Sequence, residues 1–147
     1  MTMSSEPARA EDLAAALELI AGAGLPTDGV AAAFPAGYAV VRDAAGLAAV
    51  AGLEVHGSAG LLRSVAVRPS HRSAGLGGLL VDDRLAAARR AGLDAVYLLT
   101  TTAAEYFRRH GFLELPRAEA PAVLRASTEF ASVCPASAVC MRRSVGR

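Results

Sequence analysis

A glycine-rich stretch with one arginine carries the residue types in this chain that are best suited to chemistry. Arg72-x-x-Gly75-x-Gly77-Gly78 follows an apolar run and precedes a helical pattern. Glycines let the backbone approach a ligand and aim successive N–H groups at it. The start of a helix adds unpaired N–H groups and a positive dipole end. Arg72 adds a forked positive charge, so a pyrophosphate is the expected guest, with a ligand-free strand-to-helix turn as the alternative.

The stretch differs from the two best-known phosphate-binding loops. No Gly-Lys-Ser/Thr follows it, as a Walker A loop requires. The third glycine spacing of the dinucleotide fingerprint is missing, and no ribose-binding acid follows the next strand. The ligand must therefore be argued from the elements around the loop.

Hydrophobic periodicity predicts helices first, then an antiparallel meander, then alternating strands and helices. This order predicts an α+β fold with a mixed sheet. The predicted helices cover Glu11–Ala21, Thr27–Ala33, Gly77–Ala91, Ala103–His110 and a segment opened by Pro121; the predicted strands cover Tyr38–Arg42, Leu47–Val55, Leu61–Arg68, Ala95–Thr100, Phe112–Leu115 and Ala138–Arg142.

Size and composition indicate a single domain over residues 1–147. The 15 basic and 14 acidic residues give a net charge of +1, which favours neither nucleic acid nor an anionic membrane as a partner. No apolar run has the length of a membrane span and no signal peptide is recognisable, so a cytoplasmic location is expected. Cys134 and Cys140 are spaced unlike zinc ligands and have no histidine nearby, so no metal is expected.

Val65-Ala66-Val67-Arg68-Pro69, followed by Arg72-x-x-Gly75-x-Gly77, resembles the acetyl-CoA signature of the GNAT superfamily of N-acetyltransferases. Gly111-Phe112 resembles a late element of that family. Three further segments resemble its arsenic-resistance-associated branch, namely 61–64, 97–103 and 130–141. The resemblance implies a three-layer fold, with a central mixed, mostly antiparallel sheet flanked by helices, and acetyl-CoA as the co-substrate.

The resemblance also implies cofactor contacts. Backbone groups of Val65 and Val67 would bind the pantetheine arm like an added strand, and the amide of Val65 or Ala66 would polarise the acetyl carbonyl. A splay between strands 61–68 and 95–100 would admit the thioester. The implied acetyl-CoA-binding residues are Val65, Ala66, Val67, Arg72, Ser73, Ala74, Gly75, Leu76, Gly77, Gly78, Thr100 and Phe107.

Two residues are candidates for proton transfer. The family's thiolate-protonating tyrosine lies four residues before the glycine of Gly-Phe, a position that holds Phe107 here. Its neighbour Tyr106 is the candidate acid, although one helical residue turns a side chain by about 100°. A surface role for Tyr106, with a water or a Ser/Thr hydroxyl as the acid, is the alternative. Glu54, on the strand before the loop strand, is the acidic candidate for the base, with bulk water as the alternative.

The candidate acceptor-binding residues are Arg63, Ser64 and Cys134. Arg63 stands on an apolar strand, where it either forms a salt bridge or faces the cleft and clamps an acceptor carboxylate. Cys134 and Cys140 could bind an arsenical as thiolates, whereas packing is the simpler interpretation of Cys140.

These features predict an acetyl-CoA-dependent N-acetyltransferase that acts on the primary amine of a small molecule. Amino-acid-like arsenical or phosphinic compounds are candidate acceptors. A non-catalytic acetyl-CoA sensor and a protein N-acetyltransferase are the alternatives. A homodimer through the C-terminal strand is an expectation based on the family alone.

Overall fold

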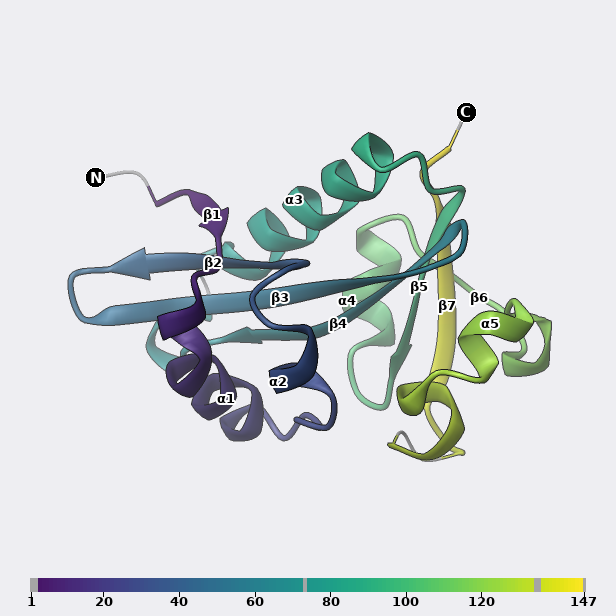
Figure 1. Cartoon of the computed structure of the whole chain (residues 1–147), viewed down its shortest axis with the longest axis horizontal. Helices are drawn as coiled ribbons and strands as arrows, with labels where there is room; N and C mark the ends of the chain where they lie inside the picture. Colours follow the sequence, from purple (N-terminus) through teal and green to yellow (C-terminus); the bar gives the residue numbers. More distant parts are fainter. Residues whose placement is uncertain (1–2, 73, 134–135, 147) are drawn as a thin grey trace.

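The computed structural model describes residues 3–72, 74–133 and 136–146, which form one mixed sheet with helices on both faces (Figure 1). The strand order is β1-β2-β3-β4-β5-β7-β6, and only β4 and β5 pair in parallel. This arrangement confirms the predicted fold class. The strands are β1 (Ser5–Pro7), β2 (Tyr38–Asp43), β3 (Gly46–His56), β4 (Ala59–Val67), β5 (Ala95–Thr100), β6 (Leu113–Glu114) and β7 (Val139–Ser144). The α-helices are α1 (Leu13–Gly22), α2 (Val30–Ala33), α3 (Leu76–Arg90), α4 (Ala104–Arg109) and α5 (Ala122–Arg125).

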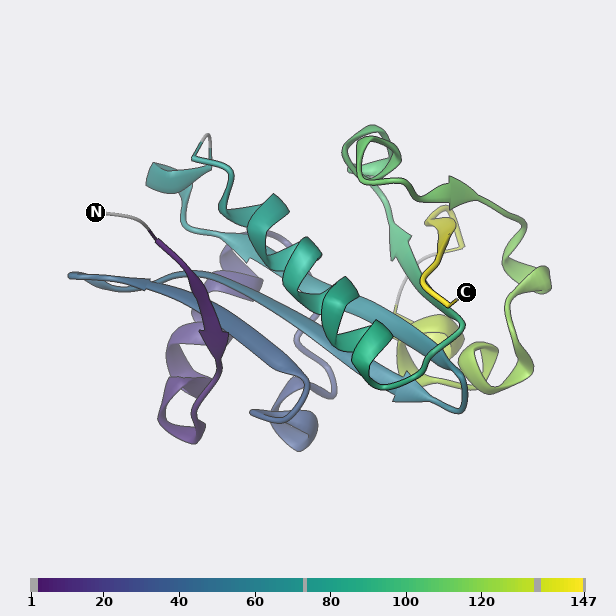
Figure 2. The same ribbon diagram turned by 90° about the horizontal axis from the view of Figure 1, so that it is seen from above.

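Side-chain alternation along the strands divides the core into two layers. Leu61 of β4 packs in a cluster with Leu124 of α5, whereas the next residue, Leu62, packs in a cluster with Val81 of α3. Helices α3 and α4 therefore cover one face, while α1, α2 and α5 cover the other. Figure 2 shows α3 lying along one face of the sheet. No helix in the described ranges is long and apolar enough to cross a membrane.

Most predicted elements are present, and the differences lie at the sheet edges. Strand β1 was not predicted, because Ser5-Glu6-Pro7 has no apolar alternation and forms a strand only by pairing with β2. Strand β6 has two residues where Phe112–Leu115 was predicted, since Phe112 is buried in the core instead. The first helix begins as a 3₁₀ turn over Ala10–Asp12 before α1 starts.

The sheet opens between β4 and β5. Parallel pairing joins residues 59–61 of β4 to residues 95–97 of β5. The pairing stops there, although β4 continues to Val67 and β5 to Thr100. The two strands thus part over the second half of their length, which agrees with the splay that the resemblance implies. Their facing backbone groups border an interior space rather than each other.

A bulge in β4 lies at the same level. Val50 pairs with Ala66 and Gly52 with Arg63, so Ser64 and Val65 together face the single residue Ala51. Ser64 has φ of 61°, in the left-handed region that residues other than glycine rarely adopt. A bulge of this kind bends a strand and redirects its side chains and N–H groups. Here it turns the middle of β4 toward the opening.

Candidate active site

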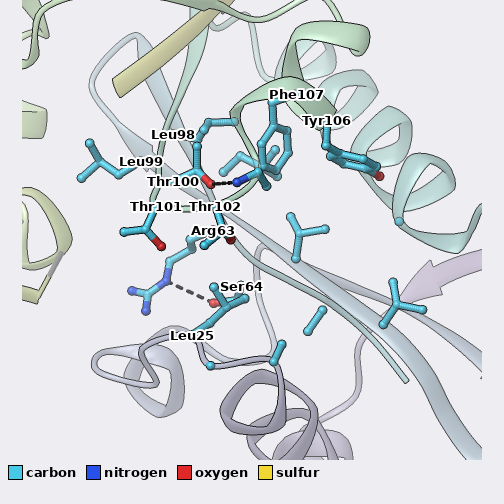
Figure 3. Close-up of a pocket in the computed structure, with 18 of the residues that line it drawn as sticks. Leu25, Arg63, Ser64, Leu98, Leu99, Thr100, Thr101, Thr102, Tyr106 and Phe107 are labelled. Carbon is cyan, nitrogen blue, oxygen red and sulfur yellow. Dashed lines mark hydrogen bonds between the residues drawn. The ribbon is translucent and has the colours of Figure 1, made fainter. Parts of the chain in front are cut away.

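A cavity of about 1000 Å³ fills the opening between β4 and β5. One end is formed by Arg72 and the first residues of α3, and the other by Arg63, Glu129 and the segment Ala23–Pro26. Residues Leu98–Ala103 and helix α4 line the middle. A single space thus connects the glycine-rich loop with a buried charged cluster, and Figure 3 shows Tyr106 on the α3 side and Arg63 at the opposite end.

The loop end presents backbone N–H groups and one arginine. Gly75 is the N-cap of α3 with φ of 78°, which an L residue rarely adopts. The N–H groups of the next residues belong to the first turn and have no partner within the helix. Arg72 is exposed, lines the cavity and donates from Nε to the Val67 carbonyl at 3.3 Å. The arrangement can hold an anion with backbone dipoles and a guanidinium.

Two glycines of this turn leave room that a side chain would fill. A Cβ on Gly77 would lie 2.7 Å from the Tyr106 hydroxyl, and a Cβ on Gly78 would lie 3.1 Å from Cε1 of His110. Both glycines line the cavity. The absence of their side chains lets the α3 backbone approach whatever occupies this end.

An ion-pair cluster anchors the segment that leads into the loop. Arg68 donates from Nη1 to Asp43 Oδ2 at 2.9 Å, and His71 Nε2 lies 3.0 Å from the same oxygen. Arg68 also contacts the Leu47 carbonyl. Arg68 is the largest cause of the lowered pKa of Asp43. The turn between β2 and β3 therefore holds both ends of the 3₁₀ segment Pro69–His71.

The middle of the cavity brings together the predicted residues Thr100, Tyr106 and Phe107. The Thr100 hydroxyl accepts a hydrogen bond from the Ala103 N–H at 3.0 Å, which ties the end of β5 to the start of α4. Phe107 is buried, and its ring meets Phe112 edge-on. The Tyr106 ring lies 4.8 Å from that of His110, and burial is the largest cause of its raised phenol pKa. Its hydroxyl lies beside Gly77, at the loop end.

Arg63 dominates the other end and is almost enclosed, with 2% of its side chain exposed. It donates from Nη1 to Glu54 Oε2 at 3.0 Å and from Nε to the Ser64 hydroxyl at 3.2 Å. Its Nη2 donates to the Asp28 carbonyl at 2.7 Å. Arg63 is therefore ion-paired and also lines the cavity, while its contact with an acceptor carboxylate stays a prediction.

Two carboxylates share this arginine. Glu54 Oε1 lies 3.0 Å from His56 Nε2 and Oε2 binds Arg63, and Glu54 does not line the cavity. Glu129 lies 3.4 Å from Arg63 Nε, has 6% of its side chain exposed, and does line it. Burial is the main cause that raises the pKa of Glu129 to about 7, with Arg63 opposing the shift.

The structure therefore gathers most, but not all, of the predicted site residues around one cavity. Val65, Ala66 and Val67 line it, whereas Ala74 is exposed outside it and the Leu76 side chain packs in the core against Leu80. Ser73 and Cys134 lie outside the described residues. Cys140 is buried as a free thiol, and burial raises its pKa to about 11, so it is not a thiolate at neutral pH.

Sequence reasoning missed Glu129, His110 and the Ala23–Pro26 segment. Glu129 follows Ser127-Thr128 in a stretch without periodicity, and nothing in its neighbours signals burial. Its position depends on packing between a π-helical turn, Glu129–Val133, and β4. Within the described ranges, no group of three or more His, Cys, Asp or Glu side chains could hold a metal ion.

Several solved structures share this fold. N-acetylglutamate synthase from Neisseria gonorrhoeae, complexed with coenzyme A and N-acetyl-glutamate, matches with a TM-score of 0.85 at 19% identity, over 100% of this chain and 36% of that one. The chain thus spans little more than a third of that synthase. Rv2747 from Mycobacterium tuberculosis, solved with CoA, gives a TM-score of 0.82 at 24% identity over 95% and 98% of the two chains. The ribosomal-protein-S18-alanine N-acetyltransferase from Escherichia coli gives 0.76 at 18% identity over 99% and 96%.

At these identities the likeness to solved structures shows the fold alone. No curated protein matches the sequence significantly. The protein-family model described as "Acetyltransferase (GNAT) domain" matches residues 35–114. This match covers more than half of the chain, from β2 to β6, and includes the β4 bulge, the glycine-rich loop and α4. The chain therefore belongs to the GNAT acetyltransferase domain family.

Proposed function

We propose that this chain is a single-domain, acetyl-CoA-dependent N-acetyltransferase that acts on the primary amine of a small molecule. The observation that carries the proposal is the one continuous cavity, which joins an anion-binding helix start to a buried charged cluster through the opening between β4 and β5. A long phosphorylated thioester and a small polar amine need such a space with two chemically different ends.

The loop end fits the diphosphate of acetyl-CoA. Backbone N–H groups at the start of α3 and the Arg72 guanidinium supply donors, and Gly77 and Gly78 leave the space open. His110 adds a side chain to the same end. The facing backbones of Val65 and Val67 can pair with the amide groups of the pantetheine arm, because β5 does not pair with them.

The co-substrate supplies an acetyl thioester, and the protein contributes position and backbone dipoles. Holding two reactants together in one cavity can account for much of the rate gain. The bulge at Ser64 and Val65 redirects the N–H groups of β4 toward the opening, so the amide of Val65 or Ala66 is the proposed donor to the developing oxyanion.

Arg63 and its surroundings support the proposed acceptor class. A guanidinium has five N–H donors. Nη1 of Arg63 donates one hydrogen to Glu54, and its second hydrogen has no partner among the described residues. That N–H can bind the carboxylate or oxyanion of an amino-acid-like acceptor, while Glu129 faces its ammonium. Together with the resemblance to the arsenic-resistance-associated branch, this favours amino-acid-like arsenical or phosphinic amines.

A thiol-release assay tests the proposal. Acetyl-CoA is incubated with the protein and a panel of amino acids, their arsenic and phosphorus analogues, simple amines and a peptide. We expect CoA release with at least one amino-acid-like amine and little with the peptide. A peptide that outperforms every small amine would instead indicate a protein acetyltransferase.

A non-catalytic acetyl-CoA sensor is the second candidate. It is favoured by the Tyr106 hydroxyl, which lies beside Gly77 at the loop end, and by Phe107 in the place of the family's acid. Binding of acetyl-CoA by calorimetry without CoA release for any amine in the panel would establish this alternative.

The ion pairs of Asp43 with Arg68 and His71 give a first quantitative prediction. Asp43→Asn removes the charge that holds Arg68 and His71. Because the loop then starts from a less fixed position, we expect acetyl-CoA affinity to fall roughly 3- to 5-fold, as for a partly exposed ion pair. Calorimetric titration with acetyl-CoA measures it. Asp83→Asn breaks a pair with Arg84 away from the cavity and should leave the affinity unchanged; equal affinities for both variants would contradict the anchoring role.

A further inference from the structure

We propose that Glu129 takes the proton from the ammonium of the acceptor and so makes the amine nucleophilic. The proposal deepens the proposed function and rests on it. It starts from the position of this carboxylate: Glu129 is the only acidic side chain among the described residues that line the cavity. It lies at the end that the glycine-rich loop does not occupy, next to the β4 bulge.

Local structure fixes Glu129 at that end. The Ser127 hydroxyl donates to the Leu124 carbonyl and accepts from the Phe130 N–H at 3.4 Å. Phe130 is buried among Leu124 and Tyr97, and its carbonyl accepts a hydrogen bond from Arg117 at 2.8 Å. The backbone on both sides of Glu129 is therefore held by packing and hydrogen bonds, which a group that must meet a small substrate requires.

The charged groups around Glu129 leave its carboxylate available to contact a substrate in the cavity. Arg63 is its one ion-pair partner in the described part of the chain, at 3.4 Å, and Arg63 is shared with Glu54. Both oxygens of Glu54 are occupied, by His56 and by Arg63, and Glu54 stands behind Arg63, outside the cavity. One guanidinium thus faces two carboxylates, and the less tightly held one points into the cavity.

The titratable groups near Glu129 set how it responds to pH. Arg63 from β4 favours its ionised form, while Glu54 from β3 disfavours it. Tyr38 from β2 is buried near Arg63 and Ser64, His56 is bound to Glu54, and Arg117 contacts the neighbouring residue Phe130. With burial as the largest cause, the pKa of Glu129 lies at about 7, where a base can both accept and release a proton.

The proton balance closes within this site. The acceptor ammonium gives one proton to the Glu129 carboxylate. The freed lone pair forms the C–N bond to the acetyl carbon, the C–S bond breaks, and its electron pair leaves with sulfur. The second proton lost by nitrogen goes to the thiolate, which yields the amide and free CoA thiol. Glu129 then releases its proton to solvent through the cavity.

The test compares Glu129→Gln with Glu129→Asp and Glu54→Gln, using the best acceptor of the panel. For the wild type, we expect kcat/KM to decrease below about pH 7, with the slope that protonation of a single group gives. Glu129→Gln should lower kcat/KM at pH 8 by roughly 100-fold, the lower range for general base catalysis, and lose this acid limb. Glu129→Asp should recover part of the rate, and Glu54→Gln should keep the limb at slightly lower pH, because Glu54 raises the pKa of Glu129.

A readout without turnover accompanies the kinetics. Carbon-13 NMR of the glutamate carboxyls in the ligand-free protein should show one group titrating near pH 7 that is absent from Glu129→Gln. If the wild type turns over an amine and Glu129→Gln keeps the acid limb, or if Glu54→Gln alone abolishes it, the proposal is wrong and the proposed function stands. A wild type that releases no CoA with any amine overturns both.

Discussion

Replacing Gly77 with Asp is expected to lower the affinity for acetyl-CoA by about 1000-fold. The new carboxylate would lie in the first turn of α3, where the N–H groups and Arg72 form the proposed anion site. It satisfies these donors within the protein and repels the diphosphate. Loss of two charge-assisted hydrogen bonds at roughly 2 kcal/mol each gives about 4 kcal/mol, or about three orders of magnitude. Calorimetric titration of each variant with acetyl-CoA measures the effect.

This substitution should spare the fold, because acidic residues in the first turn of a helix are favourable. The matched control is Ala122→Asp, which places the same charge in the exposed first turn of α5, away from the cavity. We expect wild-type affinity and an unchanged melting temperature for it. Gly77→Ala should lose less, since its Cβ only displaces the Tyr106 hydroxyl. A Gly77→Asp protein that binds acetyl-CoA within 10-fold of the wild type would exclude the α3 start as the diphosphate site.

Replacing Arg63 with Met is expected to lower the free energy of unfolding by about 3–5 kcal/mol at pH 8, the range for breaking a buried ion pair. Methionine replaces the aliphatic part of the arginine side chain, but Glu54, Glu129 and the Asp28 carbonyl lose their contacts with the guanidinium. Urea denaturation at fixed pH measures the change. The control, Arg9→Met, breaks an exposed pair with Glu6 and should cost under about 1 kcal/mol.

The cost of losing Arg63 should be smaller at pH 6 than at pH 8. The folded pKa of Glu129 lies above its ordinary value, so the unfolded chain releases this proton first and stability falls as pH rises from about 4.5 to about 7. Arg63 lowers that pKa, and without it Glu129 stays protonated to higher pH. Adding Glu129→Gln to Arg63→Met should therefore restore part of the stability at pH 8. A loss below about 1 kcal/mol at both pH values would contradict a structural role for the ion cluster.

The strands and helices that depend on residues close together in the chain could be predicted from the sequence. The alternation in Leu47–Val55, the apolar run in Ala95–Thr100 and the helical period after Gly77 each reflect neighbours close in the chain, and each element is present. The proposed cofactor end of the site is equally local, because Val65 to Gly78 belong to one continuous segment of the sequence.

The proposed acceptor end could not be predicted in the same way, because residues distant in the sequence form it. Glu129 meets Arg63 only after α5 and its following turn pack against the sheet. The two carboxylates that share Arg63 are 75 positions apart, at 54 and 129. The bulge at Ser64 was likewise hidden, since serine gives no signal for a positive φ.

The short outer strands of the sheet have a consequence for association between chains. Strand edges with unpaired backbone groups can recruit a strand from another molecule and start aggregation. Here the outermost strands are β1, with three residues ending at Pro7, and β6, with two, so neither offers a long template. A longer unpaired stretch in the described chain is that of β4 after Leu61, which borders the cavity. The unpaired edge of β4 thus faces the cavity of its own chain and not the outer rim of the sheet.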